Sequence, residues 1–190
     1  VSFVGLYASN GNAFEIKRGI NLSHWLSQRG DNSPAIKDGM SEIDFIRICR
    51  AGFDHVRLPI DEEVLWQEDG QMNKDAFEYL HKGIKWALQN DLRVIVDLHI
   101  VRAHNFNAGN EGKKNTLWDS LEAQEHFISL WRDLINELKN YPVSDVAYEI
   151  MNEPTAPNHD DWNKLAEKVY KIIRATEKKR VIVIGSNMWQ

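Results

Sequence analysis

Short apolar runs alternate along the chain with longer stretches whose apolar residues recur at helical spacing. The runs are rich in Val, Ile and Leu and predict strands at residues 16–22, 55–60, 93–100, 146–154 and 181–185. The stretches between them predict helices at residues 41–52, 74–89, 121–139 and 160–173. Residues 101–118 lack any periodicity, which is typical of a binding loop or a lid. The alternation of strand and helix predicts a parallel sheet joined by right-handed crossovers.

Local signals define the first of these helices. Ser41 followed by Asp44 is an N-cap of the capping-box type, and Gly52 is expected to end the helix. Ile43 and Cys49 fall at helical spacing and are therefore expected on its buried face.

Two α/β architectures fit the alternation. An open doubly wound sheet is complete with five strands, whereas a closed (β/α)8 barrel usually needs about 250 residues. The doubly wound fold predicts a glycine-rich phosphate turn after its first strand, and residues 21–25 contain no glycine. Polar residues at the ends of successive strands instead fit a barrel. We therefore predict an α/β fold, a partial (β/α)8 TIM barrel of about five parallel β/α units, as a single domain over residues 1–190.

Composition excludes several classes of protein. The 190 residues carry a formal net charge of −5 and no basic stripe, so we expect no nucleic-acid partner. The apolar runs are far shorter than the roughly 18 residues of a spanning helix, so we expect no membrane partner. Cys49 is the only cysteine, which excludes an internal disulfide and a cluster of thiolate ligands.

Four of the predicted strands end in polar side chains. The central one ends in Asn152-Glu153-Pro154, where the proline stops the strand and leaves the carboxylate at its tip. A carboxyl group beside an amide suits cleavage of a glycosidic bond, because the acid protonates the leaving oxygen and the amide holds a neighbouring hydroxyl. Alternatively, Glu153 caps the helix that follows. The other strand ends carry Arg57, Asp97 with His99, and Asn187.

Arg57 and His99 each admit two interpretations. Arg57 could lower the pKa of a catalytic carboxylate, or it could form a structural ion pair with a buried acid such as Glu149. Asp97 and His99 share one face of a strand, as two metal ligands would, but further ligands at suitable spacing are missing. We therefore expect no metal site, and we assign His99 to a hydrogen bond with substrate or with a catalytic carboxylate.

Three tryptophans follow strands or the long loop, where a flat ring could stack on a sugar. They are Trp25, Trp118 and Trp189. Each could equally belong to the core.

Four motifs resemble those of the family 5 glycoside hydrolases, the cellulase-like clan of retaining (β/α)8 barrels. They are Gly19-Ile20-Asn21, His55-Val56-Arg57-Leu58-Pro59, Asp97-Leu98-His99 and Asn152-Glu153-Pro154. The resemblance implies that Glu153 is the acid/base and that Asn152 binds the hydroxyl beside the reacting carbon. It also implies that Arg57 and His99 organise the nucleophile side, that Asn21 lies on the barrel floor and that Trp189 lies near a sugar subsite.

The same resemblance implies an activity. It points to an endo-β-1,4-glucanase that acts on a β-glucan polysaccharide or oligosaccharide without a cofactor, with mannanase or mixed-linkage glucanase as the alternative. We expect the protein to be secreted or periplasmic, because polysaccharides do not enter the cytoplasm.

The chain departs from the family in its second catalytic carboxylate, the nucleophile. The family takes its nucleophile from the seventh strand, and these 190 residues end just after the fifth. Retaining hydrolysis needs two carboxyl groups about 5–5.5 Å apart. The carboxylates that could replace the nucleophile are Asp61, Glu63, Asp97 and Glu111. We expect either that the chain is part of a longer enzyme or that copies form a homo-oligomer through the open barrel edges; alternatively, it is an inactive half-barrel that binds glucan or self-associates.

Overall fold

The protein is described by a computed structural model that covers residues 13–30, 32–110, 112 and 114–188. Five parallel strands form one sheet in the order β1-β2-β3-β4-β5. They are β1 (Gly19–Asn21), β2 (His55–Asp61), β3 (Arg93–Ile100), β4 (Val146–Glu149) and β5 (Ile182–Val183). Because the strand order never reverses, right-handed crossovers place the connecting helices on one side of the sheet, as in a barrel. The predicted partial (β/α)8 barrel is confirmed.

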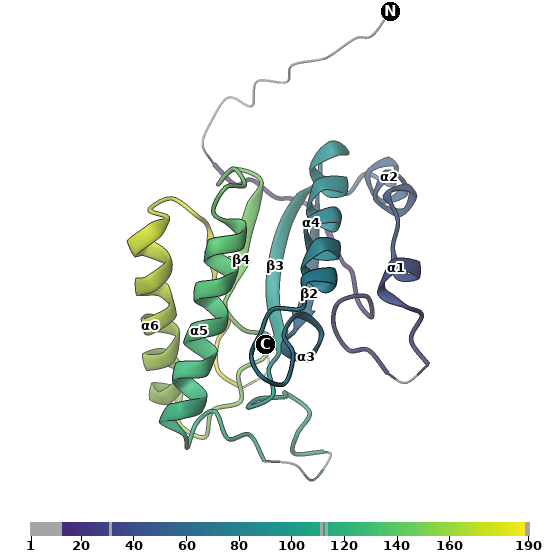
Figure 1. The fold of residues 1–190 in the computed structure, drawn as a ribbon. Coiled ribbons are helices and arrows are strands. Elements are labelled where there is room, and N and C mark those ends of the chain that lie inside the picture. The colour runs from purple at the N-terminus through teal and green to yellow at the C-terminus, as the bar shows by residue number, and fades with distance from the viewer. Residues whose placement is uncertain (1–12, 31, 111, 113, 189–190) are drawn as a thin grey trace, which may run out of the picture.

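Among the described residues, six helices lie between these strands. They are α1 (Ile36–Gly39), α2 (Glu42–Arg50), α3 (Glu62–Leu65), α4 (Lys74–Gln89), α5 (Leu121–Leu138) and α6 (His159–Thr176). In Figure 1, α6, α5 and α4 stand from left to right, β3 is visible between α5 and α4, and the carboxyl ends of the strands point towards the bottom of the view. None of the described helices is both long and apolar enough to cross a bilayer.

Helix α2 begins as its sequence predicts but buries a different residue. The backbone N–H of Ser41 donates to the Asp44 carboxylate over 2.9 Å, and Gly52 follows the helix with a φ of +85°. Ile43, which was expected to be buried, is 57% exposed, whereas Phe45 is buried. In so short a helix, the spacing of apolar residues is compatible with more than one rotation about the helix axis. Phe45 has a larger side chain than Ile43 and packs edge-on against Trp25, which favours the rotation that buries Phe45.

Alternation along the strands separates the core from the polar side of the sheet. Val56, Leu58, Val96 and Tyr148 belong to the apolar core. Neighbouring positions along a strand face opposite ways, so Arg57, Asp97 and Glu149 lie together on the other face. The fold thus brings these polar residues from three strands to one surface.

A buried ion pair beneath β4 fixes that strand. Arg180 is fully buried and bonds through Nε to the Glu177 carboxylate over 2.8 Å. The Tyr148 hydroxyl donates to the same carboxylate over 2.8 Å. Arg180 also donates to the backbone carbonyls of Tyr141, Pro142 and Val146. The strand that carries Glu149 is therefore tied to the end of α6 and to the turn before β4.

Candidate active site

Arg57 on β2 is the centre of the polar cluster. Its guanidinium donates two parallel hydrogen bonds to the Glu149 carboxylate, from Nε to Oε2 over 2.8 Å and from Nη2 to Oε1 over 2.9 Å. It also donates through Nη1 to Asn21 Oδ1 and through Nη2 to Asn152 Oδ1, each over 2.9 Å. Arg57 therefore forms the ion pair with Glu149 that the sequence left open. The same guanidinium orients the amide next to Glu153.

The charges around Arg57 keep it protonated. Burial by itself lowers the pKa of Arg57, but the hydrogen bond to Glu149 and the charges of Asp97, Glu149 and Glu153 raise it above its ordinary value. Glu153 is thus one of the carboxylates whose charge favours the protonated guanidinium.

Asp97 and His99 on β3 form the second part of the cluster. The Asp97 carboxylate lies 2.8 Å from Arg57 Nη2 and 2.6 Å from His99 Nδ1. Burial, assisted by the charge of Glu149, raises the pKa of Asp97 to about 6 against the lowering effects of His99 and Arg57. With Asp97 ionised, His99 donates from Nδ1 and keeps Nε2 as an acceptor. Among the described residues, no group of three or more His, Cys, Asp or Glu side chains could hold a metal ion.

Glu153 follows β4 in a conformation that is unfavourable for a residue with a side chain. Its φ is +41°, in the left-handed region, and the side chain is partly buried. The alternative role of Glu153 as a helix cap is wrong. Helix α6 begins at His159, and its cap is Asn158, whose side chain accepts from the backbone N–H of Asp160 over 3.0 Å. Strained backbone of this kind persists where surrounding contacts hold it and is common at functional sites.

Several contacts hold the backbone around Glu153. The N–H of Asn152 donates to the Leu98 carbonyl over 3.2 Å, and the Pro154 carbonyl accepts from Met188 over 2.8 Å. Asn187, at the end of the fifth predicted strand, accepts from the N–H of Ala156 over 2.8 Å. Asn187 therefore supports the loop that carries Glu153.

The tryptophan predictions have mixed outcomes. Trp25 is 1% exposed, donates to the Ile36 carbonyl and stacks on Trp86, so the expectation that it contacts substrate is wrong. Its position after a strand does not distinguish a ring that points outward from one that packs under the helices. Trp118 is mostly buried as well, and Trp189 lies outside the described residues.

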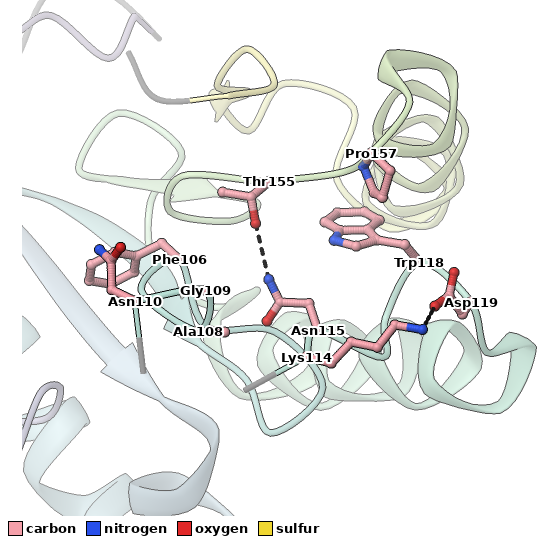
Figure 2. Close-up of a pocket in the computed structure, with 10 residues that line it drawn as sticks. All are labelled: Phe106, Ala108, Gly109, Asn110, Lys114, Asn115, Trp118, Asp119, Thr155 and Pro157. Atoms are coloured by element: carbon pink, nitrogen blue, oxygen red, sulfur yellow. Dashed lines mark hydrogen bonds and ion pairs between the residues drawn. The ribbon is translucent and has the colours of Figure 1, made fainter. Parts of the chain in front are cut away.

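A cavity of about 320 Å³ lies beside the segment that follows Glu153 (Figure 2). It is formed by the long loop between β3 and α5 and by residues 155–157. Figure 2 shows Asn115 pointing towards Thr155, and Asn115 Nδ2 donates to Thr155 Oγ1 over 3.0 Å. The lining side chains are those of Phe106, Asn110, Lys114, Asn115, Trp118, Asp119, Thr155 and Pro157, together with Ala108 and Gly109. The size and the mixture of rings and amides suit a sugar.

Two of the candidate replacements for the nucleophile are buried. Asp61 is 2% exposed and Asp97 is fully buried, so neither carboxylate can reach a sugar carbon. Burial raises the pKa of Asp61, although the N–H of Gln28 donates to it and lowers that pKa. Glu63 is exposed on α3, and Glu111 lies outside the described residues.

Two residues of this region carry no signal in the sequence. His104 and Thr155 lie in loops, bonded to each other. Loop residues have no periodic pattern that would show which way their side chains point.

A family model, described as Cellulase (glycosyl hydrolase family 5), matches residues 9–190. Endoglucanase C of Acetivibrio thermocellus is 33% identical over 178 residues, which cover 90% of this chain and 50% of that protein. Cellodextrinase A of Ruminococcus flavefaciens is 28% identical over 172 residues, with coverage of 90% and 50%. The chain spans about half the length of these curated relatives.

Solved structures give the same result. The structure of an endoglucanase from Thermotoga maritima, Cel5A, superimposes with a TM-score of 0.72 at 30% identity, over 90% of this chain and 52% of that one. A structure of T. maritima Cel5A with a mannotriose substrate has a TM-score of 0.74 at 27% identity, over 94% and 54%.

Proposed function

The chain belongs to the cellulase family, glycosyl hydrolase family 5, and from this premise we propose that the protein is a glycoside hydrolase acting on β-1,4-glucan. The observation that carries the proposal is the position of Glu153. It follows β4 at the carboxyl ends of the strands, beside an asparagine that Arg57 holds in place. Catalytic groups of (β/α)8 barrels lie at this end of the sheet.

Glu153 serves as the acid/base in this proposal. In the first step its carboxyl proton moves to the glycosidic oxygen as the bond from that oxygen to the sugar carbon breaks. Asn152 accepts from Arg57 through Oδ1, which leaves both Nδ2 hydrogens for a sugar hydroxyl. Arg57 and the imidazole of His99 lie on the nucleophile side. The nucleophile is supplied by β/α units that complete the barrel, as the seventh strand supplies it in the family, and Asp61 and Asp97 are too buried to replace it.

Several observations support the choice of substrate. Two of the curated relatives are an endoglucanase and a cellodextrinase, which favours β-1,4-linked glucan. Mannan is the second candidate, because a similar structure contains a mannotriose substrate. We place the leaving-group sugar in the cavity beside Thr155, since that cavity flanks the segment directly after the proposed acid.

Hydrolysis of carboxymethyl cellulose tests the role of Glu153. In the protein with its complete barrel, we expect Glu153→Gln to lower the release of reducing sugar by about 10²–10⁴-fold, because the amide cannot donate the proton. Glu78→Gln is the matched control, since Glu78 is an exposed glutamate on α4 that pairs with Lys82. Equal release by wild type and Glu153→Gln would remove Glu153 from the mechanism. Binding of cello-oligosaccharide without hydrolysis by either would favour the inactive half-barrel.

Two further proposals concern the molecule as a whole. As the alternative to a barrel completed by further β/α units, we propose that copies of the chain associate through the outer edges of β1 and β5, because no strand pairs with either edge among the described residues. We also propose a secreted or periplasmic location, which a polymeric substrate requires.

A further inference from the structure

His104 connects the long loop to the segment that carries Glu153. It lies four residues beyond the end of β3 and pairs with Val101 through backbone hydrogen bonds of 2.8 and 3.1 Å. Its Nε2 lies 3.2 Å from the backbone nitrogen of Thr155 and 3.1 Å from Thr155 Oγ1. Thr155 is separated from Glu153 only by Pro154.

These contacts define the state of the imidazole. A backbone N–H can only donate, so Nε2 must be the acceptor, and the ring proton of a neutral histidine must then lie on Nδ1. Burial lowers the pKa of His104 to about 4, so the ring is neutral near pH 7.

Asn115 orients the threonine hydroxyl. Asn115 accepts from the N–H of Asn105 through Oδ1 over 2.9 Å, which leaves its Nδ2 to donate to Thr155 Oγ1 over 3.0 Å (Figure 2). Because Oγ1 accepts from Asn115, its own proton is free to point at His104 Nε2. Both donors of Thr155 therefore converge on one nitrogen.

This arrangement leaves one polar group unsatisfied. His104 is almost completely buried, and its Nδ1 has no hydrogen-bond partner among the described residues. An unpaired N–H in the interior is destabilising, so an apolar side chain would suit the site better on stability alone. The acceptor that the ring presents to Thr155 accounts for a histidine here.

We propose that His104 is a positioning residue for Glu153, holding Thr155 so that the backbone of Glu153 stays in its left-handed conformation. The contacts of Asn152 fix the chain before Glu153, and those of His104 fix it after Pro154. This inference rests on the proposed role of Glu153 as the acid, because a displaced backbone would move its carboxyl group away from the glycosidic oxygen.

Nuclear magnetic resonance of the ¹⁵N-labelled chain tests the proposal without an activity assay. In the wild type we expect the imidazole ¹⁵N spectrum to show His104 with its proton on Nδ1. In His104→Leu we expect the Thr155 amide to exchange about tenfold faster, because its acceptor is lost. The coupling between the amide and α protons of Glu153 should also change, since it reports φ.

Matched variants separate positioning from a general structural role. His104→Gln keeps an acceptor oxygen near the place of Nε2, so we expect it to restore slow Thr155 exchange and the wild-type Glu153 coupling. Asn110→Ala is the control. Asn110 lines the same cavity as Thr155 but donates to Asn107, so its loss should leave the Thr155 exchange and the Glu153 coupling unchanged. We expect the melting temperature of His104→Leu to stay close to that of the wild type.

Two results would overturn the proposal. One is a wild-type His104 that carries its proton on Nε2, which remains measurable if His104→Leu does not fold. The other is a folded His104→Leu with unchanged Thr155 exchange and Glu153 coupling. Neither result depends on hydrolysis, so failure of this inference is distinct from failure of Glu153→Gln to lose activity.

Discussion

At the scale of single residues, the hydrogen bonds within the site determine which atoms of each side chain remain for substrate. Asn152 accepts from Arg57 through Oδ1, and His99 contacts Asp97 through Nδ1. The atoms left over, Nδ2 of Asn152 and Nε2 of His99, are therefore the ones available to substrate. Orientation of each group before substrate arrives lowers the cost of reaching the transition state.

Because His104 is buried, we expect the stability of the protein to depend on pH. Its folded pKa of about 4 lies below its unfolded value of 6.5, so between these values the unfolded chain binds a proton that the folded chain does not. Stability should therefore fall as pH falls from 6.5 to 4, by about 3 kcal/mol from this residue. Urea unfolding of the wild type and of His104→Gln at several pH values measures the effect.

The difference between these two proteins carries the prediction. We expect the free energy of unfolding of His104→Gln to fall less steeply below pH 6.5 than that of the wild type. His24→Gln, at an exposed histidine, should follow the wild-type slope. Parallel curves for wild type and His104→Gln would show that His104 titrates normally in the folded protein.

The direction of a side chain can be read from the sequence where a strand supplies it. Arg57 and His99 lie on strands, and alternation places them on the same face. Trp25 follows a strand, where the alternation no longer holds, and its ring packs into the core instead. His104 lies in an irregular loop, and its contact with Thr155 depends on a fold that no local pattern encodes.

At the scale of elements, the short strand β4 depends on the ion pair of Arg180 and Glu177. Arg180 stacks on Tyr148, with its guanidinium carbon 5.0 Å from the ring centre. Burial raises the pKa of the Tyr148 hydroxyl, which stays protonated and donates to Glu177. The network thus supports β4 from the side opposite Glu149.

Removal of the Arg180 side chain should lower the free energy of unfolding more than the loss of a surface ion pair does. We expect Arg180→Met to cost about 3–5 kcal/mol, because Glu177 would stay buried without its partner. Lys171→Met is the matched control: Lys171 pairs with Glu167 at the surface of α6, and its loss should cost about 1 kcal/mol or less. Denaturant unfolding monitored by circular dichroism measures both. Equal losses would mean that the buried pair does not support β4.

Prediction of the elements succeeds where a pattern is long. The bounds of α4 and β3 agree with the sequence, because each has enough residues to show its period. Helices α1 and α3, of four residues each, are too short to show one and were not predicted. Fold class was predictable for the same reason, since it depends on the order of the long elements.

At the scale of the whole molecule, the sheet is half of a barrel. The strand order follows the chain from β1 to β5, and the relatives are about twice as long. The outer edges of β1 and β5 have no strand partner among the described residues, and Ile20 and Ile184 are exposed at these edges. An unpaired edge with exposed apolar side chains is a template for pairing with another chain.

Self-association of the 190-residue chain follows from these edges. We expect sedimentation velocity to show a dimer or larger species whose fraction rises with concentration, because edge strands from two copies can pair. Ile184→Lys should shift the population towards monomer, since Ile184 is 48% exposed just beyond β5 and a charge there opposes pairing. Ile43→Lys, at an isoleucine 57% exposed on α2, is the matched control and should leave the distribution unchanged. A wild type that stays monomeric at all concentrations would show that the open edges are protected without a second copy.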